Sequence, residues 1–260
     1  MKYYVVSDIH GFYKEFIEAL TEKGYFEDKK PHKLIICGDL FDRGEEALEL
    51  QDFVVKLIEN DEAILILGNH EDLAIEFVDN ITYWMTPTIT ATHHYRNGTV
   101  DTVLALTGMT LNEAYMDPRK CAKIMNGTPY FKKIIPAMRD YFETENYIFV
   151  HGWIPCHAVG RGSRATGFVY RNDWRELDEE EWSRARWFNG MNAIREGVRE
   201  PLKTIVCGHI HASYGHSVFE GRCSEYGEDA DFSPYYEKGI IAIDASTANS
   251  GKVNCIVIED

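Results

Sequence analysis

The chain has 260 residues, of which 45% are apolar and 13% aromatic, so it can bury a core and is not an intrinsically disordered protein. Its 42 Asp and Glu residues against 27 Lys and Arg give a formal net charge of −15, which excludes long nucleic acids as partners because such a surface repels their phosphates. A phosphate-bearing ligand therefore requires a local cationic site that overcomes the charge of the whole molecule.

The N-terminus and the cysteines indicate the cellular compartment. Residues 1–7 contain only a short apolar run and lack the long apolar stretch and cleavage site of a secretory signal. No apolar stretch approaches the ~20 residues that span a bilayer, so no membrane partner is expected. The 6 cysteines form no Cys-x-x-Cys pair, which is typical of reduced thiols. We expect a cytoplasmic protein, and the sequence leaves its oligomeric state open.

Short apolar runs predict the strands of this protein. Continuous runs of four or five apolar residues are typical of strands that are buried on both faces. All but the last two runs end in a polar segment that contains glycine. In chain order, the predicted strands are Tyr3–Val6, Leu34–Cys37, Ala63–Leu67, Tyr147–Val150, Thr204–Cys207, Ile240–Ile243 and Val253–Ile258.

Helical patterns lie between the first three predicted strands. Phe12, Phe16 and Leu20 share one face of the first helix, and Leu50 and Val54 share one face of the second. This β-α-β-α-β order predicts an α/β core with right-handed crossovers. Short loops between the C-terminal strands predict a second sheet that is partly antiparallel.

Two segments interrupt the strand pattern. Residues 81–146 show helical stretches and no strand signal, whereas residues 153–200 are polar, rich in loops and then acidic. We interpret both as insertions that cover one end of the core. The domain prediction is one domain over 1–260 with a mostly helical insertion or cap at 81–146.

Polar side chains follow the predicted strands, at the sheet edge where ligands bind in open α/β folds. They comprise carboxylates, imidazoles and an amide without thiolate, a set that suits divalent ions of intermediate hardness such as Mn, Fe or Zn. These residues are too many for one tetrahedral ion, and they predict two metals that share a bridging carboxylate. The candidate ligands are Asp8, His10, Asp39, Asn69, His151, His209 and His211.

Other interpretations use the same residues. A single histidine after a strand is usually structural, and a non-catalytic protein can keep a metal-binding core as a scaffold. Cys37 and Arg43 also match the Cys-x5-Arg loop of cysteine phosphatases. In that loop Asp39 and Asp42 would repel a phosphate unless metals neutralise them, so we interpret Cys37 as a buried strand residue. A nuclease on the same metal core is disfavoured by the net charge, which still permits a short nucleotide.

The strand-end motifs resemble those of the calcineurin-like metallophosphoesterases. The Gly-Asp-x-x-Asp-Arg-Gly and Gly-Asn-His-Glu forms are similar to the phosphoprotein phosphatase branch, which includes bacterial Ser/Thr phosphatases and symmetrical diadenosine tetraphosphatases. Residues 243–255 also resemble the closing hairpin of that branch. The motifs are Asp8–Gly11, Gly38–Gly44, Gly68–Glu71, His151–Gly152 and Gly208–His209. The resemblance implies a two-sheet αββα sandwich.

The resemblance also implies roles for these residues. Asp8 and His10 would hold the first ion, Asp39 would bridge, and the second ion would be held by Asn69, His151 and His209. The catalytic residues would be His70, Asp42 and Arg43. His70 would donate a proton to the leaving oxygen, Asp42 would orient it, and Arg43 would clamp the phosphate. A metal-bridged hydroxide would then attack phosphorus in line.

The sequence leaves the roles of four further residues open. His211, in Gly-His-x-His, is either a seventh ligand or an outward-facing histidine. Trp153 either stacks on substrate or packs in the core. Arg184 and Arg186 lie in a Trp-x-Arg element that resembles a second phosphate contact of bacterial relatives, and both are candidate substrate-binding residues.

The predicted function is that of a dinuclear metal-dependent phosphoester hydrolase similar to Ser/Thr phosphoprotein phosphatases. Hydrolysis of dinucleoside polyphosphates such as diadenosine tetraphosphate, or of small phosphomonoesters, is the alternative. The expected partner is thus a phosphorylated small molecule, a nucleotide or a phosphoprotein. Manganese is the first expectation for the two divalent metal ions, with iron, zinc, nickel and cobalt as alternatives.

Overall fold

Four parallel strands and one antiparallel strand form the first sheet of the computed structural model, which describes residues 1–260. Its order is β12-β1-β2-β3-β4. Strands β1 to β4 are parallel and β12 runs antiparallel to β1. Their bounds are β1 Lys2–Val6, β2 His32–Cys37, β3 Ala63–Ile66, β4 Met138–Arg139 and β12 Ile256–Glu259.

The second sheet has a parallel centre and antiparallel edges, in the order β10-β11-β9-β6-β5. Strand β9 pairs in parallel with β11 and with β6, while β10 and β5 pair antiparallel at the two edges. The bounds are β5 Phe142–Glu143, β6 Tyr147–Phe149, β9 Thr204–Cys207, β10 Tyr235–Glu237 and β11 Ile240–Ala242.

The two sheets pack face to face through alternate residues of their strands. Val5 and Ile35 of the first sheet share an apolar cluster with Phe149 and Val206 of the second. Their neighbours in sequence point the other way, because successive side chains of a strand face opposite sides. Tyr4, for example, packs with the helices that cover the first sheet. This double burial explains why the strands are continuous apolar runs.

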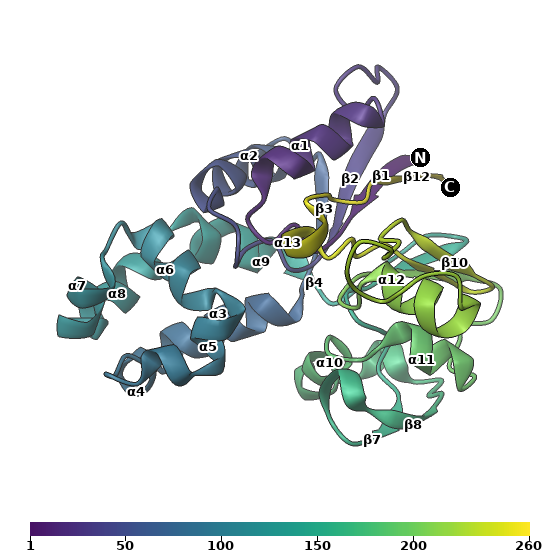
Figure 1. Cartoon of the computed structure of the whole chain (residues 1–260). Coiled ribbons are helices and arrows are strands. Elements are labelled where there is room, and N and C mark those ends of the chain that lie inside the picture. The colour runs from purple at the N-terminus through teal and green to yellow at the C-terminus, as the bar shows by residue number, and fades with distance from the viewer.

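Helices cover both outer faces of the sandwich (Figure 1). Helices α1 (Tyr13–Glu22) and α2 (Ala47–Glu59) pack on the first sheet through Phe16, Leu20, Leu50 and Val54. The second sheet packs against α10 (Glu179–Ala185), α11 (Gly190–Arg195) and α12 (Ala212–Gly215). This arrangement confirms the α/β fold class and the two-sheet αββα sandwich. No helix is both long and apolar enough to cross a membrane.

Helix α3 (Asn69–Asp79) leads into a run of short helices that ends just before β4. Their apolar side chains, including Val103 and Met125, share one buried cluster with α1 and α2. The shared core favours the proposal that 1–260 is one domain with an insertion at 81–146. The run comprises α4 Ile81–Trp84, η1 Ile89–Ala91, α5 His93–Asn97, α6 Thr99–Thr107, α7 Leu111–Met116, α8 Pro118–Met125, η2 Tyr130–Ile134 and α9 Ile135–Ala137.

A second set of short elements surrounds the second sheet. Strands β7 and β8 form a separate antiparallel hairpin, visible beside α10 and α11 in Figure 1. The set comprises β7 His157–Val159, η3 Gly162–Arg164, β8 Thr166–Val169, η4 Trp174–Glu176, η5 His216–Glu220 and α13 Thr247–Ser250.

Two details of the sequence prediction are wrong. Residues 81–146 contain the strands β4 and β5, whose two residues each are too short for a periodic signal. Strands β11 and β12 do not form a closing hairpin, because they belong to different sheets and α13 lies between them. The chain leaves the second sheet after β11 and completes the first sheet beside β1, where the two termini meet (Figure 1).

Candidate metal centre

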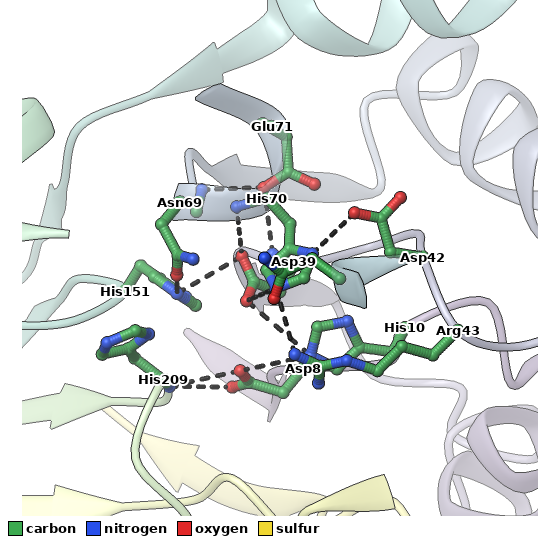
Figure 2. Close-up of polar contacts among 12 residues, drawn as sticks. Asp8, His10, Asp39, Asp42, Arg43, Asn69, His70, Glu71, His151 and His209 are labelled. Carbon is green, nitrogen blue, oxygen red and sulfur yellow. Dashed lines mark hydrogen bonds and ion pairs between the residues drawn. The ribbon is translucent and has the colours of Figure 1, made fainter. Parts of the chain in front are cut away.

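The carboxyl ends of the central strands bring the predicted ligands together (Figure 2). Asp8 and His10 follow β1, and Asp39 follows β2. Parallel strands end at the same edge of a sheet, so these side chains meet in the centre of Figure 2. The second sheet contributes His151 after β6 and His209 after β9. Both sheets therefore face one group of polar side chains.

Strained backbone is concentrated at these strand ends. Nine non-glycine residues of the chain have a positive φ, and six of them belong to the candidate site. Such conformations cost of order 1 kcal/mol each and persist where the surrounding structure enforces them, often at functional sites. The six are Asp8 (51°), His10 (52°), Asp39 (55°), Asp42 (76°), Arg43 (71°) and His209 (65°).

Two glycines give the site its close packing. A Cβ atom at Gly38, whose φ is +82°, would lie 2.6 Å from Nδ1 of His151. A Cβ at Gly68 would collide with the carboxylate of Asp39. Glycine at these positions therefore lets the loops after β2 and β3 approach the ligands directly.

Asp39 occupies the centre of two groups of candidate ligands. Its Oδ2 lies 3.7 Å from Nε2 of His10, and its Oδ1 lies 3.3 Å from Nε2 of His151. One group comprises His10, Asp39 and His70, and the other comprises Asp39, His151 and His209, with the ligand atoms of each group within 4.8 Å of one another. Asp8 adjoins the first group, with its Oδ1 3.9 Å from Nε2 of His10. Asp39 is thus the one residue placed to serve both groups.

Backbone carbonyls orient two of the imidazoles. Nδ1 of His10 lies 3.0 Å from the carbonyl oxygen of Phe41, and Nδ1 of His151 lies 2.8 Å from that of Cys37. In each ring Nδ1–H donates to the carbonyl, so Nε2 is the nitrogen that faces the site and that a metal ion would bind once it carries no proton. A hydrogen bond of this kind to the second ring nitrogen is typical of metal-binding histidines.

The side chains fit divalent cations. Nε2 of His209 is buried and has no hydrogen-bond partner. Nε2 of His151 lies 2.7 Å from Oδ1 of Asn69, so an imidazole nitrogen and an amide oxygen, two kinds of metal ligand, lie together. Because buried polar atoms are otherwise paired, the unpaired Nε2 of His209 indicates that this site is built to bind a cation. The oxygen and nitrogen donor set suits a divalent metal of intermediate hardness.

The electrostatics of the site favour added positive charge. Burial raises the pKa of Asp8 to about 6. Burial would also raise the pKa of Asp39, but His151 and His70 hold it well below its usual range. Burial alone would lower the pKa of His151, whereas Asp39 and Asp8 raise it to about 10. A proton on His151 therefore balances the buried carboxylates, and a metal ion must displace that proton.

His70 and Asp42 form a buried pair beside the ligands. Nδ1 of His70 lies 2.6 Å from Oδ2 of Asp42. The hydroxyl groups of Thr99 and Thr102 donate to Asp42 over 3.1 and 2.6 Å. Burial would lower the pKa of His70, but Asp39 and Asp42 outweigh it and raise the value. The structure therefore places beside the ligands an imidazole whose pKa is raised, and its partner Asp42 is fixed by the two threonines.

Arg43 lies at the open side of this pair. Its Nη1 is 2.7 Å from Nε2 of His10, and its Nη2 is 3.1 Å from Nε2 of His70. The residue is exposed, in contrast to the buried ligands. Its planar guanidinium can therefore meet two oxygens of a ligand that enters from solvent.

The sequence analysis missed three positioning residues. The buried carboxylate of Glu71 accepts the backbone N–H groups of Gly68, Asp39 and Leu40 over 2.8 to 3.0 Å. A Glu three residues after the N-cap of a helix can reach back to the N-cap backbone N–H, which points to this role for Glu71 in the Gly-Asn-His-Glu motif, where Gly68 is the N-cap. Thr99 and Thr102 of α6 carry no such signal, because only the tertiary structure places them beside Asp42.

The structure contradicts a phosphate-binding role for Arg186. Its side chain is only 2% exposed, and its guanidinium is paired with Asp72, Asp140 and Glu179. Arg184 is 41% exposed and has one ion pair, with Glu181 over 3.4 Å. Of the two arginines, only Arg184 can reach a substrate.

Arg184 lines a cavity of about 640 Å³ next to the candidate site. Arg161, Trp187 and Phe188 also line it, and the ring of Trp187 lies 5.7 Å from that of His209. The cavity therefore combines two guanidinium groups and one carboxylate, that of Glu180, with aromatic surface beside a candidate metal ligand.

Three other positions have roles outside the ligand groups. His211 belongs to neither ligand group, and its Nε2 lies 3.0 Å from Oε1 of Glu225. Trp153 is buried and donates to the carbonyl oxygen of Val198, so it packs in the core and does not stack on substrate. Cys37 is buried between the sheets, and burial raises the pKa of its thiol well above the usual value. A thiolate mechanism at Cys37 is thereby contradicted.

Comparison with known proteins gives one family match and several relatives. The model of the family described as calcineurin-like phosphoesterase matches residues 1–213. A symmetrical bis(5'-nucleosyl)-tetraphosphatase of Buchnera aphidicola is 45% identical over 71 residues, which cover 27% of this chain and 24% of the relative. The asymmetrical enzyme PrpE of Geobacillus thermodenitrificans is 34% identical over 134 residues, covering 49% of this chain and 50% of the relative. The chain thus spans a quarter to a half of these relatives.

Solved structures share the fold. A cold-active protein-tyrosine phosphatase of a psychrophilic Shewanella superposes with a TM-score of 0.55 and 15% identity, covering 100% of this chain and 75% of that one. A protein serine/threonine phosphatase from Saccharomyces cerevisiae gives a TM-score of 0.50 and 13% identity, covering 100% and 80%. At such low identity the similarity extends to the fold alone.

Proposed function

The chain belongs to the calcineurin-like phosphoesterase family, and from this premise we propose that it is a phosphoester hydrolase that depends on two divalent metal ions. One observation carries the proposal. The buried Asp39 is shared by two groups of ligand atoms that come from both sheets, and the buried Nε2 of His209 has no partner. Asp8 and His10 would hold one ion with Asp39, and Asn69, His151 and His209 would hold the other with it.

Two bound divalent ions supply Lewis acidity and lower the pKa of water towards ~7, which gives a nucleophile at neutral pH. The side chains of this protein carry out the remaining steps. Arg43 binds two oxygens of the phosphate and stabilises the charge that develops on them. Once the phosphate accepts the N–H groups of Arg43, Nε2 of His70 no longer accepts from Arg43, and the imidazolium form of His70 can give its Nε2 proton to the leaving oxygen. Asp42, held by two threonines, keeps His70 protonated and oriented.

We propose a dinucleoside polyphosphate as the substrate class. The cavity beside the site offers Trp187 to stack on a base and Arg161 and Arg184 to bind further phosphates. The relatives named as bis(5'-nucleosyl)-tetraphosphatases support this choice. A phosphoprotein substrate remains the second candidate, because the same core suits phosphoserine. Manganese is our proposal for the metal, since carboxylate, amide and imidazole ligands suit it.

The dependence on metal is tested with p-nitrophenyl phosphate. A chelator should abolish hydrolysis, and added Mn²⁺ should restore it. His70→Ala should lose about a hundredfold or more in kcat while it keeps its bound metal, because it removes a proton donor and no ligand. Activity without metal, or full activity of His70→Ala, would contradict the mechanism. Inactivity of the wild type with every divalent ion and substrate would instead favour a non-catalytic scaffold.

The substrate class is tested with a panel of diadenosine tetraphosphate, a phosphoserine peptide and p-nitrophenyl phosphate. Arg184→Ala should raise KM for the dinucleotide and leave kinetics on p-nitrophenyl phosphate unchanged, because the small ester does not reach the cavity. Arg96→Ala, which changes an exposed arginine outside the cavity, is the matched control. Higher kcat/KM for the peptide than for the dinucleotide would favour the phosphoprotein class.

A further inference from the structure

A second cluster of metal-ligating side chains lies outside the centre described above. It comprises Glu76 of α3 and the adjacent His93 and His94 of α5, whose ligand atoms all lie within 4.8 Å of one another. Glu76 follows His70 by six residues on the same helix, so it lies about 9 Å farther along the helix axis. No element of the proposed phosphoesterase mechanism uses these side chains.

His94 is buried, and its one polar contact is with Glu76. Its side chain is 0% exposed, and Nε2 lies 2.5 Å from Oε2 of Glu76, an ion-pair contact outside hydrogen-bond geometry. Nδ1 of His94 has no partner. Buried polar atoms are rarely left unpaired, so this nitrogen and the misaligned pair beside it indicate a further group that binds here.

Trp84 orients the carboxylate and encloses the cluster. Its Nε1–H donates to Oε1 of Glu76 over 2.9 Å, which leaves Oε2 directed at His94. The indole also packs edge-on against both histidines, with ring centroids 5.1 Å from His93 and 4.7 Å from His94. Trp84 is not itself a ligand, and its contacts fix the orientation of the ligand side chains, as hydrogen-bond partners of the ligands do in metal sites.

The cluster has a route to solvent through an acidic cavity. Glu76 and His93 line a cavity of about 910 Å³ between α3 and α10. Five carboxylates line this cavity and two guanidinium groups oppose them, Arg184 in the lining and Arg186 paired with Asp72 and Glu179, so the cavity keeps a negative excess that attracts cations. Besides Glu76, the acidic side chains are Asp72, Asp79, Glu179 and Glu180.

We propose that Glu76, His93 and His94 bind one additional divalent cation of the zinc type. Two imidazoles and one carboxylate are a ligand set that Zn²⁺ accepts, and the cavity leaves a fourth position for water. The ion joins α3 to α5. Helix α5 ends at Gly98, next to Thr99, which donates to Asp42, so the ion fixes the segment that supports the Asp42–His70 pair.

The test measures zinc bound per chain after equilibrium dialysis against Zn²⁺ alone. Glu76→Gln and His93→Ala should each bind one ion fewer than the wild type, with at least about a tenfold loss of affinity at this site. The matched control is His157→Ala, which removes an exposed histidine far from the cluster and should bind as much zinc as the wild type. Glu76 is half-buried and His93 exposed, so both variants should fold, which far-UV circular dichroism checks.

A second experiment uses the Asp39→Asn variant, which lacks the carboxylate shared by the two ions of the candidate metal centre. Zn²⁺ should raise the midpoint of its thermal unfolding and should not do so in Asp39→Asn/His93→Ala. Equal zinc content in the wild type and both single variants would overturn the proposal and leave Glu76 and His94 as an ion pair only. An absence of zinc binding to the folded Asp39→Asn variant would also overturn the proposal.

Discussion

At the scale of single residues, Asp39 and His211 differ in what surrounds them. Asp39 lies between His10 and His151 and is buried, whereas His211 is paired with Glu225. We expect Asp39→Asn to reduce kcat on p-nitrophenyl phosphate with Mn²⁺ far more than His211→Ala, because a bridging ligand serves both ions. Steady-state kinetics at saturating Mn²⁺ measures the order, and the reverse order would show that the ligand assignment is wrong.

The sequence predicted which residues lie near one another better than it predicted the direction of their side chains. Asp8, His10 and Asp39 follow parallel strands, and parallel strands of one sheet place their carboxyl ends at the same edge. Their proximity therefore follows from the strand pattern alone. Arg186 follows Arg184 by only two residues, yet one guanidinium is buried among carboxylates and the other faces a cavity. The direction of a side chain depends on the elements packed around it, which a local motif does not reveal. The roles of the ligands themselves stay predictions.

At the scale of elements, Arg186 joins helices from the two halves of the sandwich. Its guanidinium contacts Asp72 of α3, Glu179 of α10 and Asp140 between β4 and β5, over 2.5 to 2.8 Å. Arg186→Met should lower the free energy of unfolding by about 3 kcal/mol, because it leaves partly buried carboxylates without a counter-charge. Urea denaturation measures this, with Arg184→Ala as a control that should change stability by less than about 0.5 kcal/mol. Equal effects in the two variants would contradict the structural role.

Glu143 on β5 gives the fold a pH-dependent contact. Hydrogen bonds from Arg175, together with Lys203, lower its pKa from 4.5 to about 2. A carboxyl group with a lowered pKa stabilises the folded state fully above its unfolded pKa of 4.5, and the contribution is lost as the pH falls through about 2.

Glu143→Gln should therefore lower the free energy of unfolding at pH 7 by about 1 kcal/mol, a value reduced for solvent screening of this partly exposed pair. The difference from the wild type should shrink below pH 4.5 and vanish near pH 2. Urea unfolding at several pH values measures it. Glu145→Gln changes an exposed glutamate in the turn that follows β5 and should show no such trend.

At the scale of the whole molecule, the candidate metal centre joins the two sheets. Asp8, His10 and Asp39 come from the first sheet, and His151 and His209 from the second. Ions bound there stabilise the folded state and not the unfolded chain, by about 2.7 kcal/mol at a metal concentration of 100 Kd. Mn²⁺ should therefore raise the midpoint of thermal unfolding in the wild type and raise it much less in Asp39→Asn. Calorimetry measures both, and equal shifts would place the bound Mn²⁺ elsewhere.

The sequence by itself determined the strand runs, the polar residues that end them and the family. These follow from local chemistry, since a buried strand needs a continuous apolar run and a parallel sheet collects its carboxyl ends at one edge. The tertiary structure alone decided that β11 and β12 belong to different sheets, that Thr99 and Thr102 hold Asp42, and that Arg186 is buried. It also brought Glu76 and His94 together from separate helices. These outcomes depend on packing between distant segments, which no local periodicity records.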